Sequence, residues 1–203
     1  MRVNVRKPKS ISAETKGAIL EAAWDLISQR GRTDVTMTEV AERAGISRQA
    51  VFYAFGGRPG LLLAMVRHKD SLTSHVARLR EISATPQPEP ETLVRYAEVW
   101  LDYLPLIYPV GILLDAASLG DPEAAGAWND RMTGALLGGF RRLAAAVHER
   151  SPLPGAPRQI ADAIWAQVHP TMYRRLVSDC GWSDAAFRAH QMDIVRTLAG
   201  IGR

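Results

Sequence analysis

The sequence has little of several features, and each shortage excludes a class of protein. It holds one cysteine, Cys180, so neither an intrachain disulfide nor a four-cysteine zinc site can form. Its longest stretch without a charged side chain, residues 103–114, has 12 residues, whereas a membrane-spanning helix needs about 20. Residues 1–10 are basic and have no apolar stretch behind them, unlike a secretory signal. These shortages predict a cytoplasmic protein with no membrane span.

Catalytic motifs are also missing. We find no phosphate-binding loop, no G-x-G-x-x-G, no serine elbow and no H-E-x-x-H, because the pattern that begins at His148 meets a proline at position 152. Cys180 is followed by His190, but a lone cysteine beside a glycine is usually structural. His68 and His75 could form half of a metal site, and two ligands alone are weak evidence for one. The sequence therefore predicts no enzyme, no cofactor and no metal.

The positive charge is concentrated at one end of the chain. Residues 1–9 have four basic side chains and no acid, whereas residues 10–60 and 61–203 each balance basic against acidic side chains. The basic side chains of this N-terminal arm are Arg2, Arg6, Lys7 and Lys9. Such an arm is either a solvated tail or a segment that reaches toward phosphates, and the arm alone does not decide between them.

Apolar residues recur at intervals of three and four almost throughout, which is typical of helices. We therefore predict an all-α fold of about nine helices. Residues 10–60 would form a three-helix unit with a helix-turn-helix, and residues 61–203 a larger helical domain. The helices expected in the larger part cover residues 59–83, 91–104, 107–119, 121–148, 158–179 and 184–199, with Pro105 breaking the second from the third.

The three-helix unit is marked by capping residues. Residues 12–30 read as a helix that begins after Ser12 and ends at Gly31. Thr36-Met-Thr-Glu39 is a capping box, and the helix that it opens ends at Gly45. Ser47 then caps a third helix almost at once, which gives the proportions of a helix-turn-helix.

The third helix carries side chains suited to reading bases. Arg48 can donate two parallel hydrogen bonds to guanine, and Gln49 can pair with adenine. Tyr53 projects from the same outer face, whereas Val51 and Phe55 can turn inward. No acid occurs between Ser47 and Phe55, where a negative charge would repel phosphate.

These residues resemble a known family. Residues 35–55 and the following Gly-Gly-Arg-Pro-Gly-Leu are similar to the DNA-binding domain of the tetracycline-repressor (TetR) family, and the similarity extends back over residues 19–23. It implies phosphate contacts at the start of the second helix and at Arg58, with base contacts from the third helix. The DNA-binding set is Thr36, Thr38, Ser47, Arg48, Gln49, Phe52, Tyr53 and Arg58. The family's usual tyrosine falls on Phe52 and its histidine on Ala54, so those phosphate contacts are lost.

The resemblance also implies a dimer. In this family the last two helices pair with those of a second copy in a four-helix interface. The apolar residues available for it are Ile160, Ile164, Leu176, Phe187, Ile194 and Leu198. Some of these belong to the core of one chain instead, and the sequence does not separate the two groups.

The same resemblance implies a small-molecule pocket among the middle helices. The predicted lining is Trp100, Tyr103, Leu104, Tyr108, Trp128, Met132, Trp165 and His169. His169, one helical turn after Trp165, would orient the ligand, unless it bonds to a neighbouring backbone carbonyl. The neutral charge balance of this half favours an uncharged or weakly charged apolar effector.

The sequence thus predicts a homodimeric, ligand-responsive repressor on a roughly palindromic double-stranded DNA operator. A DNA-binding dimer without an effector, including a nucleoid-type binder, remains the alternative. An enclosed cavity of roughly 300–1,000 Å³ among the middle helices would argue against that alternative.

Overall fold

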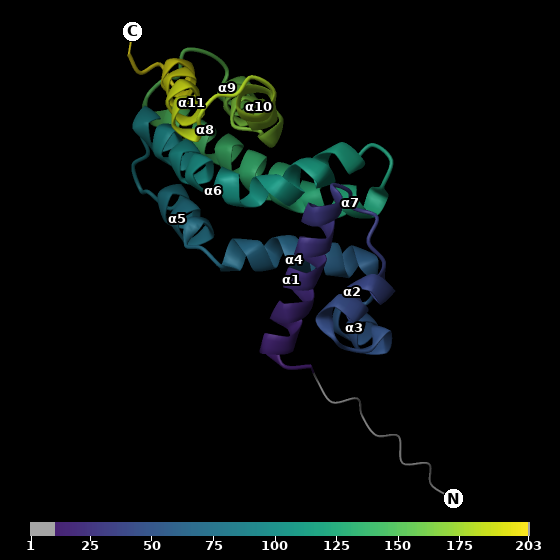
Figure 1. Ribbon diagram of the computed structural model, residues 1–203. Coiled ribbons are helices and arrows are strands. Elements are labelled where there is room, and N and C mark those ends of the chain that lie inside the picture. The colour runs from purple at the N-terminus through teal and green to yellow at the C-terminus, as the bar shows by residue number, and fades with distance from the viewer. Residues whose placement is uncertain (1–10, 203) are drawn as a thin grey trace, which may run out of the picture.

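The computed structural model describes residues 11–202, which are helical nearly throughout (Figure 1). Of the residues described, 78% are helical and none is in a strand, which confirms the predicted all-α fold. The α-helices are α1 (Ala13–Arg30), α2 (Met37–Ala44), α3 (Arg48–Phe55), α4 (Arg58–Ser71), α5 (His75–Ser83), α6 (Pro90–Ala117), α7 (Pro122–Asn129), α8 (Gly138–Arg150), α9 (Pro157–Gln167), α10 (Pro170–Tyr173) and α11 (Asp184–Leu198). The N-terminal arm, residues 1–9, lies outside the described residues.

Helices α1, α2 and α3 begin and end where their capping residues predict. The Ser47 hydroxyl accepts a hydrogen bond from the Ala50 N–H at 3.2 Å at the start of α3. Both bonds of the Thr36–Glu39 capping box are present at the start of α2. Gly45 ends α2 with φ of 69°, a left-handed conformation that favours glycine and lets α3 start after a very short turn.

The prediction of one helix over residues 59–83 is wrong. The chain turns at residues 72–74 and divides that segment into α4 and α5. The Ser71 hydroxyl donates to the His68 carbonyl at 2.7 Å, and the Thr73 hydroxyl lies 2.6 Å from Nδ1 of His75. Such local bonds offer the backbone an alternative to the helix. The turn lays α5 against α6.

The predicted break at Pro105 is also wrong, because α6 passes through both Pro105 and Pro109. A proline inside a helix costs about 3 kcal/mol. This helix offsets that cost by burial, since Leu101, Leu104 and Val110 are buried on either side of the prolines. Within the described residues, α6 is also long and apolar enough to cross a membrane (mean hydropathy 1.3), but 56% of its most apolar stretch is buried in the protein, as in a core helix.

Of two further predicted helices, one is confirmed and the other is wrong. Residues 121–148 form one helical run as expected, with a π-helical segment, Asp130–Leu137, joining α7 to α8. The helix expected over residues 158–179 instead stops at Gln167. Pro170 disfavours a helical conformation of the residue before it, and His169 is extended (φ −69°, ψ 145°), so a new helix, α10, starts at Pro170. A second π-helical segment, Arg174–Asp179, follows α10.

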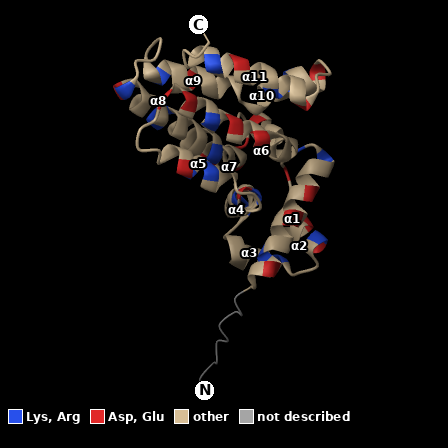
Figure 2. Cartoon of the chain, turned by 90° about the vertical axis from the view of Figure 1, so that its left-hand side faces the viewer, with Lys and Arg blue, Asp and Glu red and all other residues tan. Residues whose placement is uncertain are grey.

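The first and last helices of the chain lie at opposite ends of the molecule (Figure 1). The unit α1–α3 lies at one end and α9–α11 at the other, with α4 and α6 between them. Helix α4 packs against both α1 and α7. Acidic and basic residues are interspersed along the helices of the larger part (Figure 2). The connection from the three-helix unit to the rest therefore runs through α4.

Candidate nucleic-acid interface and ligand cavity

Helix α3 presents one exposed polar and aromatic face. Ser47, Arg48 and Gln49 are exposed at its start. Phe52 and Tyr53 are 54% and 62% exposed, a large apolar area to leave in water. The Gln49 amide donates to the Tyr53 hydroxyl at 3.3 Å. Because Val51 is fully buried on the opposite side, these five predicted DNA-binding residues are brought together on the outer face.

The start of α2 is built as a cap. The Glu39 carboxylate accepts hydrogen bonds from the Thr36 N–H and hydroxyl, both at 2.8 Å, and pairs with Arg30 at 2.8 Å. The Arg30 bond, followed by the Thr36 bonds, lowers the pKa of Glu39 to about 2. Thr36 is thus a structural cap, and Thr38 beside it is exposed. The first turn of α2 offers Thr38 to a phosphate more freely than Thr36.

Arg58 is not placed as the family resemblance implies. Its guanidinium donates to both carboxylate oxygens of Asp121 (2.7 and 3.2 Å), to Glu123 (2.7 Å) and to the Thr33 carbonyl (2.7 Å). The Arg58 bond is the largest cause that lowers the pKa of Asp121. We name this group of four residues the α4–α7 clasp. Arg58 therefore joins the three-helix unit to α7, and its predicted phosphate contact is replaced.

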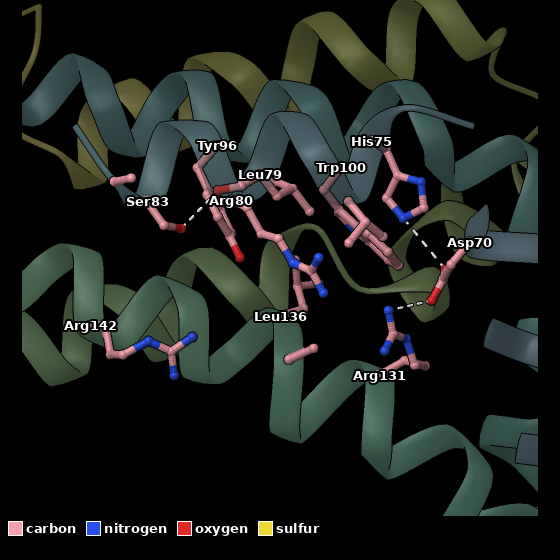
Figure 3. A pocket seen from close by; sticks show the side chains of 13 residues that line it. Asp70, His75, Leu79, Arg80, Ser83, Tyr96, Trp100, Arg131, Leu136 and Arg142 are labelled. Carbon is pink, nitrogen blue, oxygen red and sulfur yellow. Dashed lines mark hydrogen bonds and ion pairs between the residues drawn. The ribbon is translucent and has the colours of Figure 1, made fainter. Parts of the chain in front are cut away.

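The structure contains a cavity of about 350 Å³ between α5, α6 and the run from α7 to α8 (Figure 3). Its lining residues are Asp70, His75, Val76, Leu79, Arg80, Ser83, Ala84, Tyr96, Trp100, Arg131, Ala135, Leu136 and Arg142. Arg80, Ser83 and Arg142 are exposed and mark its opening to solvent. The cavity is within the size range of ligand pockets, although it is open rather than enclosed.

Asp70, at the end of α4, anchors the inner end of the cavity. Its carboxylate accepts a hydrogen bond from the Tyr103 hydroxyl at 3.1 Å, lies 3.4 Å from Nε2 of His75 and pairs with Arg131. Burial, followed by the Asp70 charge, raises the pKa of Tyr103. The His75 ring stacks on Tyr103 with centroids 3.6 Å apart. The inner end of the cavity is thus fixed directly to α4.

Trp100 is the only one of the predicted ligand residues that lines this cavity. The rest pack elsewhere in the described chain. Leu104, Trp128 and Met132 are buried in the core, and a Cβ on Gly111 would lie 2.6 Å from the Trp128 ring. The Trp165 N–H donates to a backbone carbonyl at 3.1 Å, and the hydroxyls of Tyr103 and Tyr108 bond to Asp70 and Ser178. We therefore assign these aromatic residues to packing.

The prediction that His169 lies on the same helix as Trp165 is wrong. Helix α9 ends at Gln167, and His169 is the N-cap of α10. Its Nδ1 accepts a hydrogen bond from the Thr171 N–H at 3.3 Å, and its Nε2 lies 3.5 Å from the Asp115 carboxylate. Burial lowers the pKa of His169 and outweighs the opposing effect of Asp115. Both ring nitrogens are thus used inside the protein, so the predicted ligand-orienting role is replaced by capping.

His68 and His75, the two histidines considered as half of a metal site, face different partners. Nε2 of His68 lies 3.0 Å from Glu21, whereas Nε2 of His75 faces Asp70. Within residues 11–202, no three His, Cys, Asp or Glu side chains form a cluster that could hold a metal ion.

The predicted dimer residues divide into two groups. Ile160, Ile164 and Phe187 are at most 7% exposed within a single chain, so we reassign them from the dimer interface to the core of α9 and α11. Leu176, Ile194 and Leu198 are half-buried on the outer side of the same end of the molecule. The candidate interface therefore reduces to these three residues.

Sequence comparison identifies the three-helix unit. Residues 19–65 match the family model of the bacterial regulatory proteins of the tetR family. The HTH-type transcriptional regulator TtgR of Pseudomonas putida is 32% identical over 77 residues, which cover 38% of this chain and 37% of TtgR. The similarity to this curated relative thus spans little more than a third of either protein.

Solved structures extend the likeness to the whole fold. A protein described as a TetR-family transcriptional regulator from Rhodococcus has a TM-score of 0.73 at 21% identity, over 92% of this chain and all of that one. A transcriptional regulator from Saccharomonospora viridis, solved in complex with choline, has a TM-score of 0.69 at 22% identity, over 91% of this chain and 97% of that one. At these identities the likeness establishes the fold.

Proposed function

We propose, on the premise that residues 19–65 match the family model of the bacterial regulatory proteins of the tetR family, that this chain is a TetR-family, ligand-responsive transcriptional repressor. It acts in the cytoplasm as a homodimer, and each protomer inserts α3 into the major groove of one half of a roughly palindromic operator. A small molecule with an apolar body releases it from DNA.

The observation that carries the proposal is the exposed face of α3. Arg48 and Gln49 are exposed at its start, and within α3 no acid opposes a phosphate. Phe52 and Tyr53 provide flat apolar surface beside them for sugar or thymine methyl groups. A helix face with these features is better explained by contacts to bases than by an ordinary solvated surface.

The release step rests on α4. This helix carries Asp70 of the cavity at one end and Arg58 of the α4–α7 clasp at the other. A ligand that favours a different position of α4 would change the spacing of the two α3 helices in a dimer. A coupling of about 1–3 kcal/mol would weaken operator binding roughly 5- to 150-fold. The cavity is open rather than enclosed, so its volume alone does not decide against a DNA-binding dimer without an effector; the direct link from the cavity through Asp70 to α4 is what favours this proposal.

Arg48→Ala and Gln49→Ala should each weaken operator binding by about 1–3 kcal/mol, because each variant loses a bidentate base contact. The measurement is a titration of each variant against an operator selected from random duplexes and against a scrambled duplex at the same salt. Arg175→Ala is the control, since Arg175 is an exposed arginine near the other end of the molecule. Equal losses on both duplexes would show that these residues hold the DNA backbone and do not read bases.

A further inference from the structure

The residues that line the cavity carry a net positive charge, although its middle section is apolar. Leu79, Tyr96, Trp100 and Leu136 form an apolar middle section. The three arginines of the lining, against the single carboxylate of Asp70, leave a formal charge of +2 with histidine neutral. The sequence, which is neutral over residues 61–203, gave no indication of this local excess.

The arginine at the inner end is already neutralised. Arg131 pairs with both Asp70 and Asp130, and the Tyr103 hydroxyl donates a hydrogen bond to the other carboxylate oxygen of Asp70. A cationic ligand would have to displace Arg131 from Asp70, which would leave that arginine without its buried partner. The inner end is therefore a poor site for a positive head group.

The two arginines at the opening are different. Within residues 11–202, neither Arg80 nor Arg142 has a carboxylate oxygen within 4.0 Å. They come from α5 and α8, and Figure 3 shows both guanidinium groups turned toward the cavity. The Tyr96 hydroxyl and the Arg142 guanidinium lie over adjacent residues of α8, since a Cβ on Gly139 would be 2.0 Å from that hydroxyl and a Cβ on Gly138 would be 3.2 Å from Nη1 of Arg142. An anionic group at this opening would meet two forked donors.

We propose that the cavity binds an amphipathic anion, with its acidic head group between Arg80 and Arg142 and its apolar chain along Trp100 and Leu136. This inference names the ligand class for the proposed function and rests on it. It narrows the effector from an apolar molecule to one with a carboxylate or similar head. The apolar wall suits a hydrocarbon chain, which needs no hydrogen bonds inside the cavity.

The test compares three probes that share one chain and differ in the head group: decanoate, decanol and decyltrimethylammonium. Calorimetric titration of the full-length protein, below the concentrations at which the probes aggregate, gives each affinity. We expect decanoate to bind once per protomer and about tenfold more tightly than decanol. Its affinity should fall as salt rises, while that of decanol should not.

The double variant Arg80→Gln/Arg142→Gln should lose about tenfold in decanoate affinity and keep its affinity for decanol. The control Arg78→Gln/Arg141→Gln removes one arginine from each of the same helices outside the lining, and should leave decanoate binding unchanged. Failure of decanoate to bind, equal binding of decanol, tighter binding of the ammonium probe, or an unaffected double variant would each overturn the inference.

Operator binding separates this inference from the proposed function. Decanoate that binds as expected but leaves operator affinity unchanged would confirm the ligand class and contradict the ligand-responsive repressor. Release of operator by the ammonium probe alone would confirm a ligand-responsive regulator and contradict the anionic ligand class.

Discussion

Replacing Arg58 with glutamate should lower the free energy of unfolding by about 2–4 kcal/mol, because the change leaves three carboxylates together where the α4–α7 clasp now has a cation. The Arg58 side chain is 20% exposed and that of Asp121 25%, so solvent screens part of the effect and the estimate stays below that for a fully buried pair. Denaturant unfolding followed by circular dichroism measures it.

A matched control lies on the same helix. Arg67 also pairs with an aspartate, Asp130, but its side chain is 55% exposed. Arg67→Glu should therefore cost no more than about 1 kcal/mol. Similar losses from the two variants would contradict the view that Arg58 joins two parts of the molecule.

The pH dependence of the Arg58→Glu effect has a definite sign. Arg58 lowers the folded-state pKa of Asp121, so the clasp stabilises the protein fully above the ordinary pKa of an aspartate, about 3.9. That contribution is lost as pH falls through the lowered value. The difference in unfolding free energy between wild type and Arg58→Glu should therefore be constant near neutral pH and shrink in acid, beginning above the ordinary carboxylate pKa because the three clustered carboxylates of the variant repel one another and protonate more readily. A difference that grows in acid would contradict this origin.

The helix caps could be predicted from the sequence, whereas the contacts of the clasp could not. Ser12, Thr36 and Ser47 act within four residues of themselves, so the caps that they form could be predicted from local spacing. The partners of Arg58 lie 63 and 65 residues away. No local pattern brings them together, and the family resemblance pointed to phosphate instead.

The cavity could not be predicted for a related reason. Arg80 and Arg142 line one cavity only because the chain turns at residues 72–74 and folds α5 onto α6, a turn that helical periodicity did not indicate. The aromatic residues misled the prediction because a tryptophan at helical spacing fits a packed core as well as a pocket. Trp128 is in the core because Gly111 admits its ring, a contact between separate helices. Of the aromatic residues predicted to line the pocket, Trp100 alone lies on the wall of this cavity.

A glutamate at Ile194 or Leu198 should dissociate the proposed dimer. Both side chains are half-buried on α11, and a charge that remains unpaired in an apolar interface is costly. A single half-site then has to hold each protomer, so operator affinity should fall about 100-fold or more. Sedimentation velocity and operator titration on the same samples measure both effects, with circular dichroism to show that each variant is folded.

Ala189→Glu provides the matched control for these two variants. Ala189 is exposed on the same helix, five residues before Ile194 and so about 140° around it. It should remain dimeric and bind operator as the wild type does. A folded Ile194→Glu or Leu198→Glu variant that stays dimeric would remove that residue from the interface. Loss of operator binding by such a dimer would mean that α11 affects α3 through the fold of one chain and not through its partner.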